Sequence, residues 1–389
     1  MQQQWLAWRA QTVWYTLMIR PLAISNIGYR GMVVRSTRSR FIQQRVELSD
    51  DDHSSRYGQT SERQLVLNEI LVVAPTLCND VFGNYVIQKM FEFGNTAMRN
   101  ALGEVVTREG VHLSTAMYGC RVVQKALQFL EDDRLRSLML KFHGEVERLI
   151  HDQNGNHVIQ KCIEVICAKS LRDPSSSSLI DFIVNAVLAK LADLACHGYG
   201  CRVVQRMLEH CLGEQKLKTL FCIHDNISVL IDDQFGNYVI QHVLQYGRPS
   251  DRETILTLVL ERGVLNVSRQ KFASNVVEKI LVFGERNLRS RLIEEMLTVR
   301  GNAGGGVGIS DGVGGVSVVG TTSALTPNVN DLILLAMVRD AFANYVVQKA
   351  LEVAEGSQRT RLVESLRGHL VELRQFTYAK HILTKIEKE

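Results

Sequence analysis

The 389-residue chain has little proline and no long apolar run. Five prolines in this length suit a largely helical protein, because proline inside a helix removes a backbone hydrogen bond and clashes with the preceding turn. No apolar run reaches the ~18 residues that a membrane-spanning helix needs, so we expect no membrane segment. The eight cysteines include no Cys-x-x-Cys pair, which argues against a zinc ribbon. Scattered free thiols suit a reducing compartment, and we expect a cytoplasmic protein.

Acidic residues are missing from the first 46 positions, where seven arginines and three tryptophans occur. An arginine-rich, acid-free start is typical of a mitochondrial targeting peptide. The alternative is a poorly ordered leader, which the lack of serine richness and of a clear amphipathic run favours. We expect residues 1–34 to form such a basic leader. Over the whole chain, the net charge of +4 permits a polyanionic partner without requiring one.

One five-residue pattern occurs eight times along the chain. Its first position is small and polar, its second is flat, its third and fourth are apolar, and its fifth is Gln or, once, Glu. The copies begin at Ser39, Asn84, Cys120, Asn156, Cys201, Asn237, Ser274 and Asn344. Four of the seven intervals between them are 36 or 37 residues, and the other three are 45, 45 and 70. A fixed period of ~20–50 residues is the signature of a solenoid built from stacked repeats.

The residues around each copy have the 3.6-residue period of an amphipathic helix. Further helices are expected at 63–73, 179–194 and 252–261. The three long intervals predict flexible insertions near 48–60, 171–178 and 301–326. The last of these holds nine glycines and one charged residue between positions 301 and 320. Because it lacks the Gly-x-x-x-x-Gly-Lys motif, we expect a loop and not a phosphate-binding site.

On a helix, positions one and five lie one turn apart on the same face, and position two lies ~100° around from position one. Each copy therefore offers two polar side chains for the edge of an unpaired base and one flat side chain for its face. Stacking on such a side chain contributes ~1–3 kcal/mol per base, and one base per helical repeat is an established mode of RNA recognition. The predicted base-edge residues are Ser39, Gln43, Asn84, Gln88, Cys120, Gln124, Asn156, Gln160, Cys201, Gln205, Asn237, Gln241, Ser274, Glu278, Asn344 and Gln348. The predicted stacking residues are Arg40, Tyr85, Arg121, His157, Arg202, Tyr238, Asn275 and Tyr345.

Three of the copies lie in motifs that resemble the Pumilio homology domain of the PUF family. They read FGNYVIQK at 82–89, YGCRVVQK at 118–125 and GNHVIQK at 155–161. The resemblance implies an all-α fold, a curved α-solenoid with a right-handed superhelix, made of eight three-helix repeats with terminal capping segments. It places this domain at 35–389, after the leader. Lys380 and Thr384 stand where the family has its C-terminal cap, whereas residues 19–34 do not resemble the N-terminal cap well.

The resemblance also assigns a base to each repeat. In the family, Asn with Gln reads uracil, Cys or Ser with Gln reads adenine, and Ser with Glu reads guanine, with the 5′ base on the eighth repeat. The implied target is 5′-UGUAUAUA-3′. The chemistry agrees, because the carboxylate of Glu278 can only accept hydrogen bonds and the edge of guanine offers two adjacent donors.

These expectations describe a protein that binds single-stranded RNA in mRNA 3′ untranslated regions and acts as a post-transcriptional regulator through a deadenylase or other effector. We expect a monomer with no cofactor and no metal. An enzyme is not expected, since the neighbouring pairs at 151–152 and 224–225 do not face each other on a helix. Two alternatives remain. An armadillo- or HEAT-like protein-binding scaffold gives no reason for the repeated glutamine, and a nucleolar relative in ribosome biogenesis usually has degenerate base-edge residues.

Overall fold

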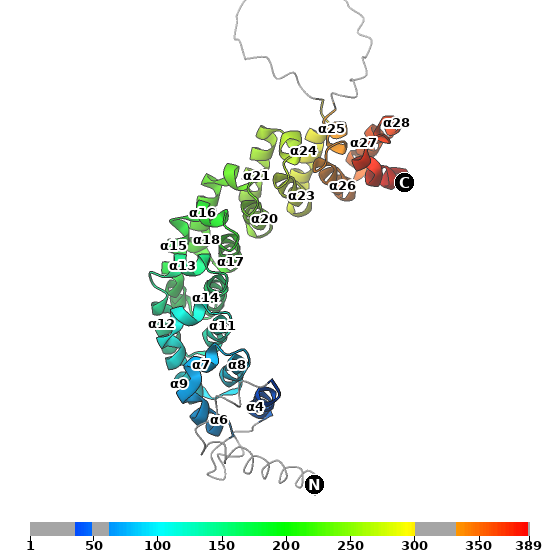
Figure 1. Cartoon of the computed structure of the whole chain (residues 1–389). Helices are drawn as coiled ribbons and strands as arrows, with labels where there is room; N and C mark the ends of the chain where they lie inside the picture. Colours follow the sequence, from blue (N-terminus) through cyan, green and yellow to red (C-terminus); the bar gives the residue numbers. More distant parts are fainter. Residues whose placement is uncertain (1–35, 49–61, 300–331, 388–389) are drawn as a thin grey trace, which may run out of the picture. The chain divides into compact units, whose positions relative to one another are not determined.

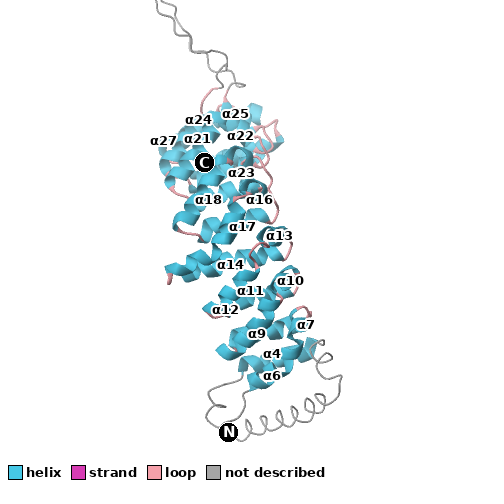
Figure 2. Cartoon of the chain, turned by 90° about the vertical axis from the view of Figure 1, so that its left-hand side faces the viewer, coloured by secondary structure: helices cyan, strands magenta, loops and turns pink. Residues whose placement is uncertain are grey.

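The computed structural model describes residues 36–48, 62–299 and 332–387. Within these ranges the regular elements are helices (Figure 2). One isolated bridge joins Val299 and Leu332. None of the described helices has the length and apolar character to span a bilayer. The leader at 1–34 and the insertions near 48–60 and 301–326 lie outside the described residues, apart from Leu48.

A full repeat consists of three helices: a short one, a longer one that carries the five-residue pattern, and a third that runs back. The third repeat shows all three, in α10 (Gly110–Thr115), α11 (Gly119–Phe129) and α12 (Asp132–Lys141). The helices that carry the pattern, here called the reading helices, are α4 (Ser36–Leu48), α8 (Gly83–Phe93), α11, α14 (Gly155–Ser170), α17 (Gly200–His210), α20 (Gly236–Tyr246), α23 (Ala273–Phe283) and α26 (Ala343–Val353).

The other helices of the repeats flank the reading helices in sequence. The short helices are α7 (Ala74–Cys78), α10, α13 (Val146–His151), α16 (Leu191–Ala195), α19 (Ile227–Leu230), α22 (Val264–Ser268) and α25 (Ile333–Val338). The third helices are α6 (Glu62–Ile70), α9 (Thr96–Arg108), α12, α15 (Asp181–Leu188), α18 (Gly213–Asp225), α21 (Pro249–Arg262), α24 (Arg286–Met296) and α27 (Gly356–Arg367). The chain ends with α28 (Leu370–Leu373) and α29 (Lys380–Glu387). This architecture is an α-solenoid, as predicted.

The chain divides into two compact units between the fourth and fifth repeats. One unit contains the residues up to Lys190 together with His210–Gln215, and the other contains Leu191–Glu209 and the residues from Lys216 onward. In the first unit, α8 packs against α4 and α11, and α11 packs against α14 (Figure 1). In the second, α23 packs against α20 and α26, and α26 packs against α29. Within each unit, neighbouring repeats therefore bury their apolar faces against one another, as solenoids do.

A close backbone contact fixes the start of five reading helices. A Cβ atom at Gly155 would lie 2.6 Å from the carbonyl oxygen of Leu149, and one at Gly200 would lie 2.4 Å from that of Leu194. Gly83, Gly119 and Gly236 meet the equivalent carbonyl of their own short helix in the same way. Only glycine allows such an approach without movement of the chain. The glycines that precede position one therefore set the angle between the short helix and the reading helix.

The structure differs from the sequence-based expectation between the fourth and fifth repeats. Where a flexible insertion was expected near 171–178, a 3-10 helix η2 spans Pro174–Ile180. The side chain of Asp173 caps it by accepting from the backbone N–H and the hydroxyl of Ser175. The helix expected at 179–194 is wrong as one element: it is divided between the end of η2, α15 and α16. Proline in the first turn and a side-chain cap stabilise the start of this helix. The serine-rich composition alone predicts a loop instead.

Candidate nucleic-acid interface

The five positions of the pattern differ sharply in exposure, and they do so in the same way in successive repeats. At positions three and four, the side chains of the second to eighth repeats are fully buried and form the core. Position two faces solvent: Tyr85, Tyr238 and Tyr345 are 44%, 50% and 56% exposed, and Asn275 is half-buried. Position five is mostly half-buried, and Gln160 is buried. The reading helices thus present a row of flat side chains beside a row of partly accessible amides.

Position one differs from the sequence-based picture, in which it stood beside position five at the edge of a base. All eight side chains at position one are at most 4% exposed. They lie in the first turn of the reading helix, where the preceding turn of chain covers them. Within the pattern, positions two and five are therefore more accessible than position one.

In the four Asn–Gln repeats, one hydrogen-bond network recurs. In the second repeat, Nδ2 of Asn84 donates to the backbone oxygens of Asp80 and Val81 at 2.8 and 3.1 Å. Its Oδ1 then accepts from Nε2 of Gln88 at 2.9 Å. The same three bonds occur at Asn156, Asn237 and Asn344 with Gln160, Gln241 and Gln348. Each asparagine amide is therefore locked, and each glutamine keeps one N–H and its carbonyl oxygen for a ligand.

The repeats with cysteine at position one have a simpler arrangement. The thiols of Cys120 and Cys201 donate to the backbone oxygens of Met117 and Gly198, three residues earlier, at 3.5 and 3.6 Å. Burial raises the pKa of both thiols, so they remain protonated donors at neutral pH. A cysteine side chain is shorter than that of asparagine, so it fills less space at position one.

The seventh repeat is the only one with an acid at position five. Ser274 donates from Oγ to the backbone oxygen of Lys271 at 3.2 Å, which leaves the carboxyl of Glu278 one helical turn away. Burial raises the pKa of Glu278, although the nearby charge of Lys349 opposes this shift. A half-buried carboxylate that can only accept is suited to a ligand with two adjacent N–H donors.

The first repeat also has a hydrogen bond between positions one and five. Nε2 of Gln43 donates to Oγ of Ser39 at 2.9 Å, and this hydroxyl donates to the backbone oxygen of Phe82 in the second repeat at 3.0 Å. Arg40 at position two is exposed. After the eighth repeat, Thr384 donates to the backbone oxygen of Lys380 at 2.9 Å on α29, where the C-terminal cap was expected.

A set of ion pairs lies one turn beyond the pattern on the reading helices and was not expected from the sequence. Its members are a cation at position six and an acid at position nine, counted from position one. Glu92 contacts Lys89 of its own repeat and Lys125 of the next, at 3.4 and 3.7 Å. Glu352 bridges Lys349 and Lys385 in the same way. The signal in the sequence was the cation that follows the pattern in six of the eight copies.

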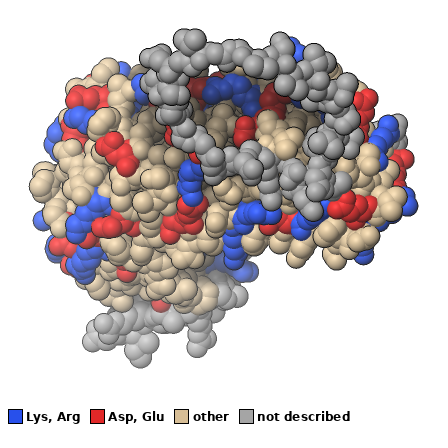
Figure 3. Space-filling view, turned by 90° about the horizontal axis from the view of Figure 1, so that it is seen from above, with Lys and Arg blue, Asp and Glu red and all other residues tan. Residues whose placement is uncertain are grey.

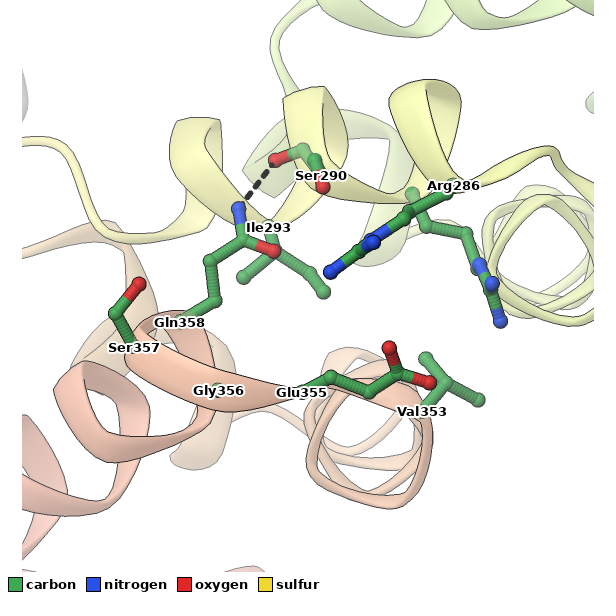
Figure 4. A pocket seen from close by; sticks show the side chains of 9 residues that line it. Arg286, Ser290, Ile293, Val353, Glu355, Gly356, Ser357 and Gln358 are labelled. Atoms are coloured by element: carbon green, nitrogen blue, oxygen red, sulfur yellow. Dashed lines mark hydrogen bonds between the residues drawn. The ribbon is translucent and has the colours of Figure 1, made fainter.

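Among the described residues, pockets also lie away from the five-residue pattern. Acidic and basic side chains are interspersed on the face shown in Figure 3. A pocket between α24 and α27 is lined by Arg286, Arg289 and Gln358, whose Nε2 donates to the backbone oxygen of Ser290 at 3.1 Å (Figure 4). No residue of the five-residue pattern lines it. Within the described ranges, no group of three or more His, Cys, Asp or Glu residues could hold a metal ion.

Fold and surface together define a class of protein: an α-solenoid that presents one polar triplet per repeat. The family model of the Pumilio-family RNA binding repeat matches seven stretches of the chain. These are residues 75–107, 110–141, 146–169, 190–222, 233–260, 263–297 and 335–367. The chain belongs to the Pumilio family. The matched stretches contain seven of the eight copies of the pattern, and the copy at Ser39 lies before the first of them.

Curated relatives and solved structures agree with this assignment. The chain is 30% identical over 346 residues to the Pumilio domain-containing protein C6G9.14 of Schizosaccharomyces pombe, covering 87% of this chain and 45% of that protein. It is 44% identical over 350 residues to Pumilio homolog 1 of Xenopus laevis, covering 88% of this chain and 26% of the relative. The chain thus spans about half or less of the length of these relatives. The structure of the Puf3 RNA binding domain bound to a Cox17 RNA 3′ UTR recognition sequence matches with a TM-score of 0.74 at 33% identity, covering 95% of this chain and 99% of that one.

Proposed function

We propose that this protein binds single-stranded RNA in a sequence-specific manner, with one base at each of its eight repeats. The observation that carries the proposal is the recurrence of one burial pattern along the reading helices while the polar side chains change. A packing role alone requires only positions three and four to be uniform. It does not explain a flat side chain at position two, exposed in all but the seventh repeat, beside an amide or carboxyl that is partly accessible in all but the fourth. The family model and the RNA-bound Puf3 structure support the same partner.

The proposed target is 5′-UGUAUAUA-3′. The N–H and carbonyl that Gln88, Gln160, Gln241 and Gln348 keep for a ligand complement the alternating donors and acceptors of uracil. Glu278 accepts from the two adjacent donors of guanine, and the space beside Ser39, Cys120 and Cys201 accommodates adenine. Each base lies between the position-two side chains of successive repeats, such as Tyr238 and Asn275, where stacking contributes ~1–3 kcal/mol.

Binding alone changes no transcript, so the proposal includes an effector. We propose that the protein binds mRNA 3′ untranslated regions in the cytoplasm and lowers translation or transcript lifetime by recruiting a deadenylase or another effector protein. A reporter mRNA with two copies of the octamer tests this step. Its level and translation are expected to fall when the protein is present, and to be unaffected when the second base of each octamer is changed to C.

A direct binding experiment tests the central claim. The dissociation constants of 5′-UGUAUAUA-3′, 5′-UCUAUAUA-3′ and the DNA analogue of the first are measured by fluorescence anisotropy. We expect the first RNA to bind at least about tenfold more tightly than the second, since a well-made base contact discriminates by ~1–3 kcal/mol. Equal affinities for the two RNAs would contradict specific recognition and leave a protein-binding scaffold as the better explanation.

A further inference from the structure

An aspartate accompanies every asparagine at position one. Asp80, Asp152, Asp233 and Asp340 each stand four residues before the asparagine of the second, fourth, sixth and eighth repeats. The other four repeats have Arg35, Ala116, His197 and Gln270 at that place. The aspartate therefore occurs in the repeats that have asparagine at position one and in none of the others, although it lies outside the five-residue pattern.

The side chain of this aspartate holds the turn that leads into the reading helix. In the sixth repeat, Oδ1 of Asp233 accepts from the backbone N–H groups of Phe235 and Gly236 at 2.8 and 2.7 Å. The same pair of bonds occurs at Asp80, Asp152 and Asp340. The turn fixed in this way directs two backbone oxygens, those of Asp233 and Gln234, at Nδ2 of Asn237 at 2.9 and 3.0 Å.

Three of the repeats without the aspartate use only one backbone oxygen of this turn as an acceptor. The side chains of Cys120, Cys201 and Ser274 carry a single donor, and each bonds only the backbone oxygen three residues earlier. An asparagine amide has two N–H donors and needs both oxygens. In the fifth repeat, Nδ1 of His197 accepts from the equivalent backbone N–H groups, but over longer distances of 3.3 and 3.2 Å.

The orientation of the asparagine determines which way the glutamine amide faces. With Nδ2 of Asn237 bound to two carbonyl oxygens, its Oδ1 must point to Gln241 and accept from Nε2 at 2.8 Å. If Gln241 turned its amide over, two oxygens would face each other. The donor and the acceptor that it presents to a base are thus fixed in order. Uracil carries the N3–H donor between two carbonyl acceptors, whereas adenine carries the N1 acceptor beside the N6 amino donor. A glutamine oxygen held to accept from N3–H of uracil would face N1 of adenine, acceptor against acceptor, so a fixed amide disfavours adenine.

From this chain of contacts we infer that Asp80, Asp152, Asp233 and Asp340 are positioning residues for uracil selectivity, which they enforce through Asn and Gln without touching the base. The inference rests on the proposed function. It extends the uracil-selective motif of this protein from two residues to three: an aspartate, an asparagine four residues later, and a glutamine four residues after that.

Removal of one aspartate tests the inference. The variants Asp233→Ala and Asp233→Asn are compared for binding to 5′-UGUAUAUA-3′ and to 5′-UGAAUAUA-3′, in which the third base is adenine. We expect D233A to lose about fivefold of its preference for uracil, the effect expected when one helix-capping side chain is lost. D233N should retain the preference, because asparagine caps a helix as well as aspartate does.

The same proteins supply an internal control at a second base. Preference at the fifth base, which the fourth repeat reads, is measured with 5′-UGUAAAUA-3′ and should not change in D233A. Each preference is a ratio of two affinities of one preparation, so partial unfolding cancels. If D233A weakens binding to all three RNAs by the same factor, the aspartate supports only the fold and the inference is overturned.

A gain of selectivity tests it independently in the third repeat. Cys120→Asn alone recreates the Asn–Gln pair with Gln124, and the double variant A116D/C120N adds the aspartate. Preference at the sixth base is the ratio of the affinities for 5′-UGUAUUUA-3′ and 5′-UGUAUAUA-3′. This ratio should be about fivefold higher for the double variant than for C120N, by the same cap contribution. Equal preferences would overturn the inference. If the wild-type protein itself shows no preference at the third base, the base assignment fails first and the proposed function is at fault.

Discussion

Gln160 donates a hydrogen bond from Nε2 to Oδ1 of Asn156, its partner one turn earlier on α14, over 2.9 Å. Asn156 is fully buried and Gln160 is 9% exposed. In each Asn–Gln repeat the two polar side chains therefore act as one unit, in which the asparagine orients the glutamine. Changing either residue alone removes a partner from the other, whereas changing both together can install a new base preference.

The seventh repeat allows the sharpest exchange of specificity. The double variant Ser274→Asn, Glu278→Gln replaces a carboxylate that only accepts by an amide that also donates. We expect its preference at the second base to move from guanine to uracil by about one to two decades in each direction, since a bidentate contact is worth ~1–3 kcal/mol. Affinities for UGUAUAUA and UUUAUAUA measure it, and the wild type is the control. A double variant that still prefers guanine would refute the assignment of Ser274 and Glu278.

The same repeat makes a prediction about pH. Burial raises the pKa of Glu278 above the ordinary glutamate value of 4.5. In the proposed assignment, guanine binds the ionised carboxylate. As the pH falls through the raised pKa, the free protein takes up a proton that binding must release. Affinity for UGUAUAUA should therefore fall by up to about tenfold per pH unit in that range, from one linked proton. S274N/E278Q with UUUAUAUA lacks this carboxyl and should show a shallower dependence; parallel curves would count against the role of Glu278.

Stacking at position two should depend on the ring and not on its hydroxyl. Tyr238 is half exposed on α20, and Y238A should weaken binding of UGUAUAUA by ~1–3 kcal/mol, or about one to two decades. Y238F keeps the aromatic face and should bind nearly as the wild type does. Val229, another exposed apolar residue of the same repeat, serves as the matched control, and V229A should leave the dissociation constant unchanged. An equal loss in Y238F and Y238A would point to the hydroxyl instead.

The close approach at Gly155 should make this position intolerant of a side chain. A Cβ atom there would lie 2.6 Å from the carbonyl oxygen of Leu149, so G155A must move α13 away from α14. We expect a loss of ~1–3 kcal/mol of stability, as for other overpacked core sites, visible as a lower urea midpoint. Ala343 occupies the equivalent place in the eighth repeat, and A343G should cost ~1 kcal/mol or less. A G155A midpoint equal to that of the wild type would show that the contact relaxes freely.

The sequence alone determined the repeat, its period and the helical nature of each unit. These features follow from local periodicity: the apolar pair at positions three and four recurs in every copy, and a 3.6-residue period requires no knowledge of distant residues. The resemblance to the Pumilio family, since confirmed, came from the same short motifs. The base-edge and stacking residues remain predictions that binding experiments must test.

Only the tertiary structure decided how the polar positions divide their roles. Helical geometry places Asn156 and Gln160 on one face, but it does not reveal that the turn before the helix covers the first and leaves the second closer to solvent. Nor does the pattern itself contain Asp152, whose carboxylate acts on Asn156 through a turn of backbone. Burial and backbone direction depend on how each short helix meets its reading helix, and that contact is formed only when the repeat folds.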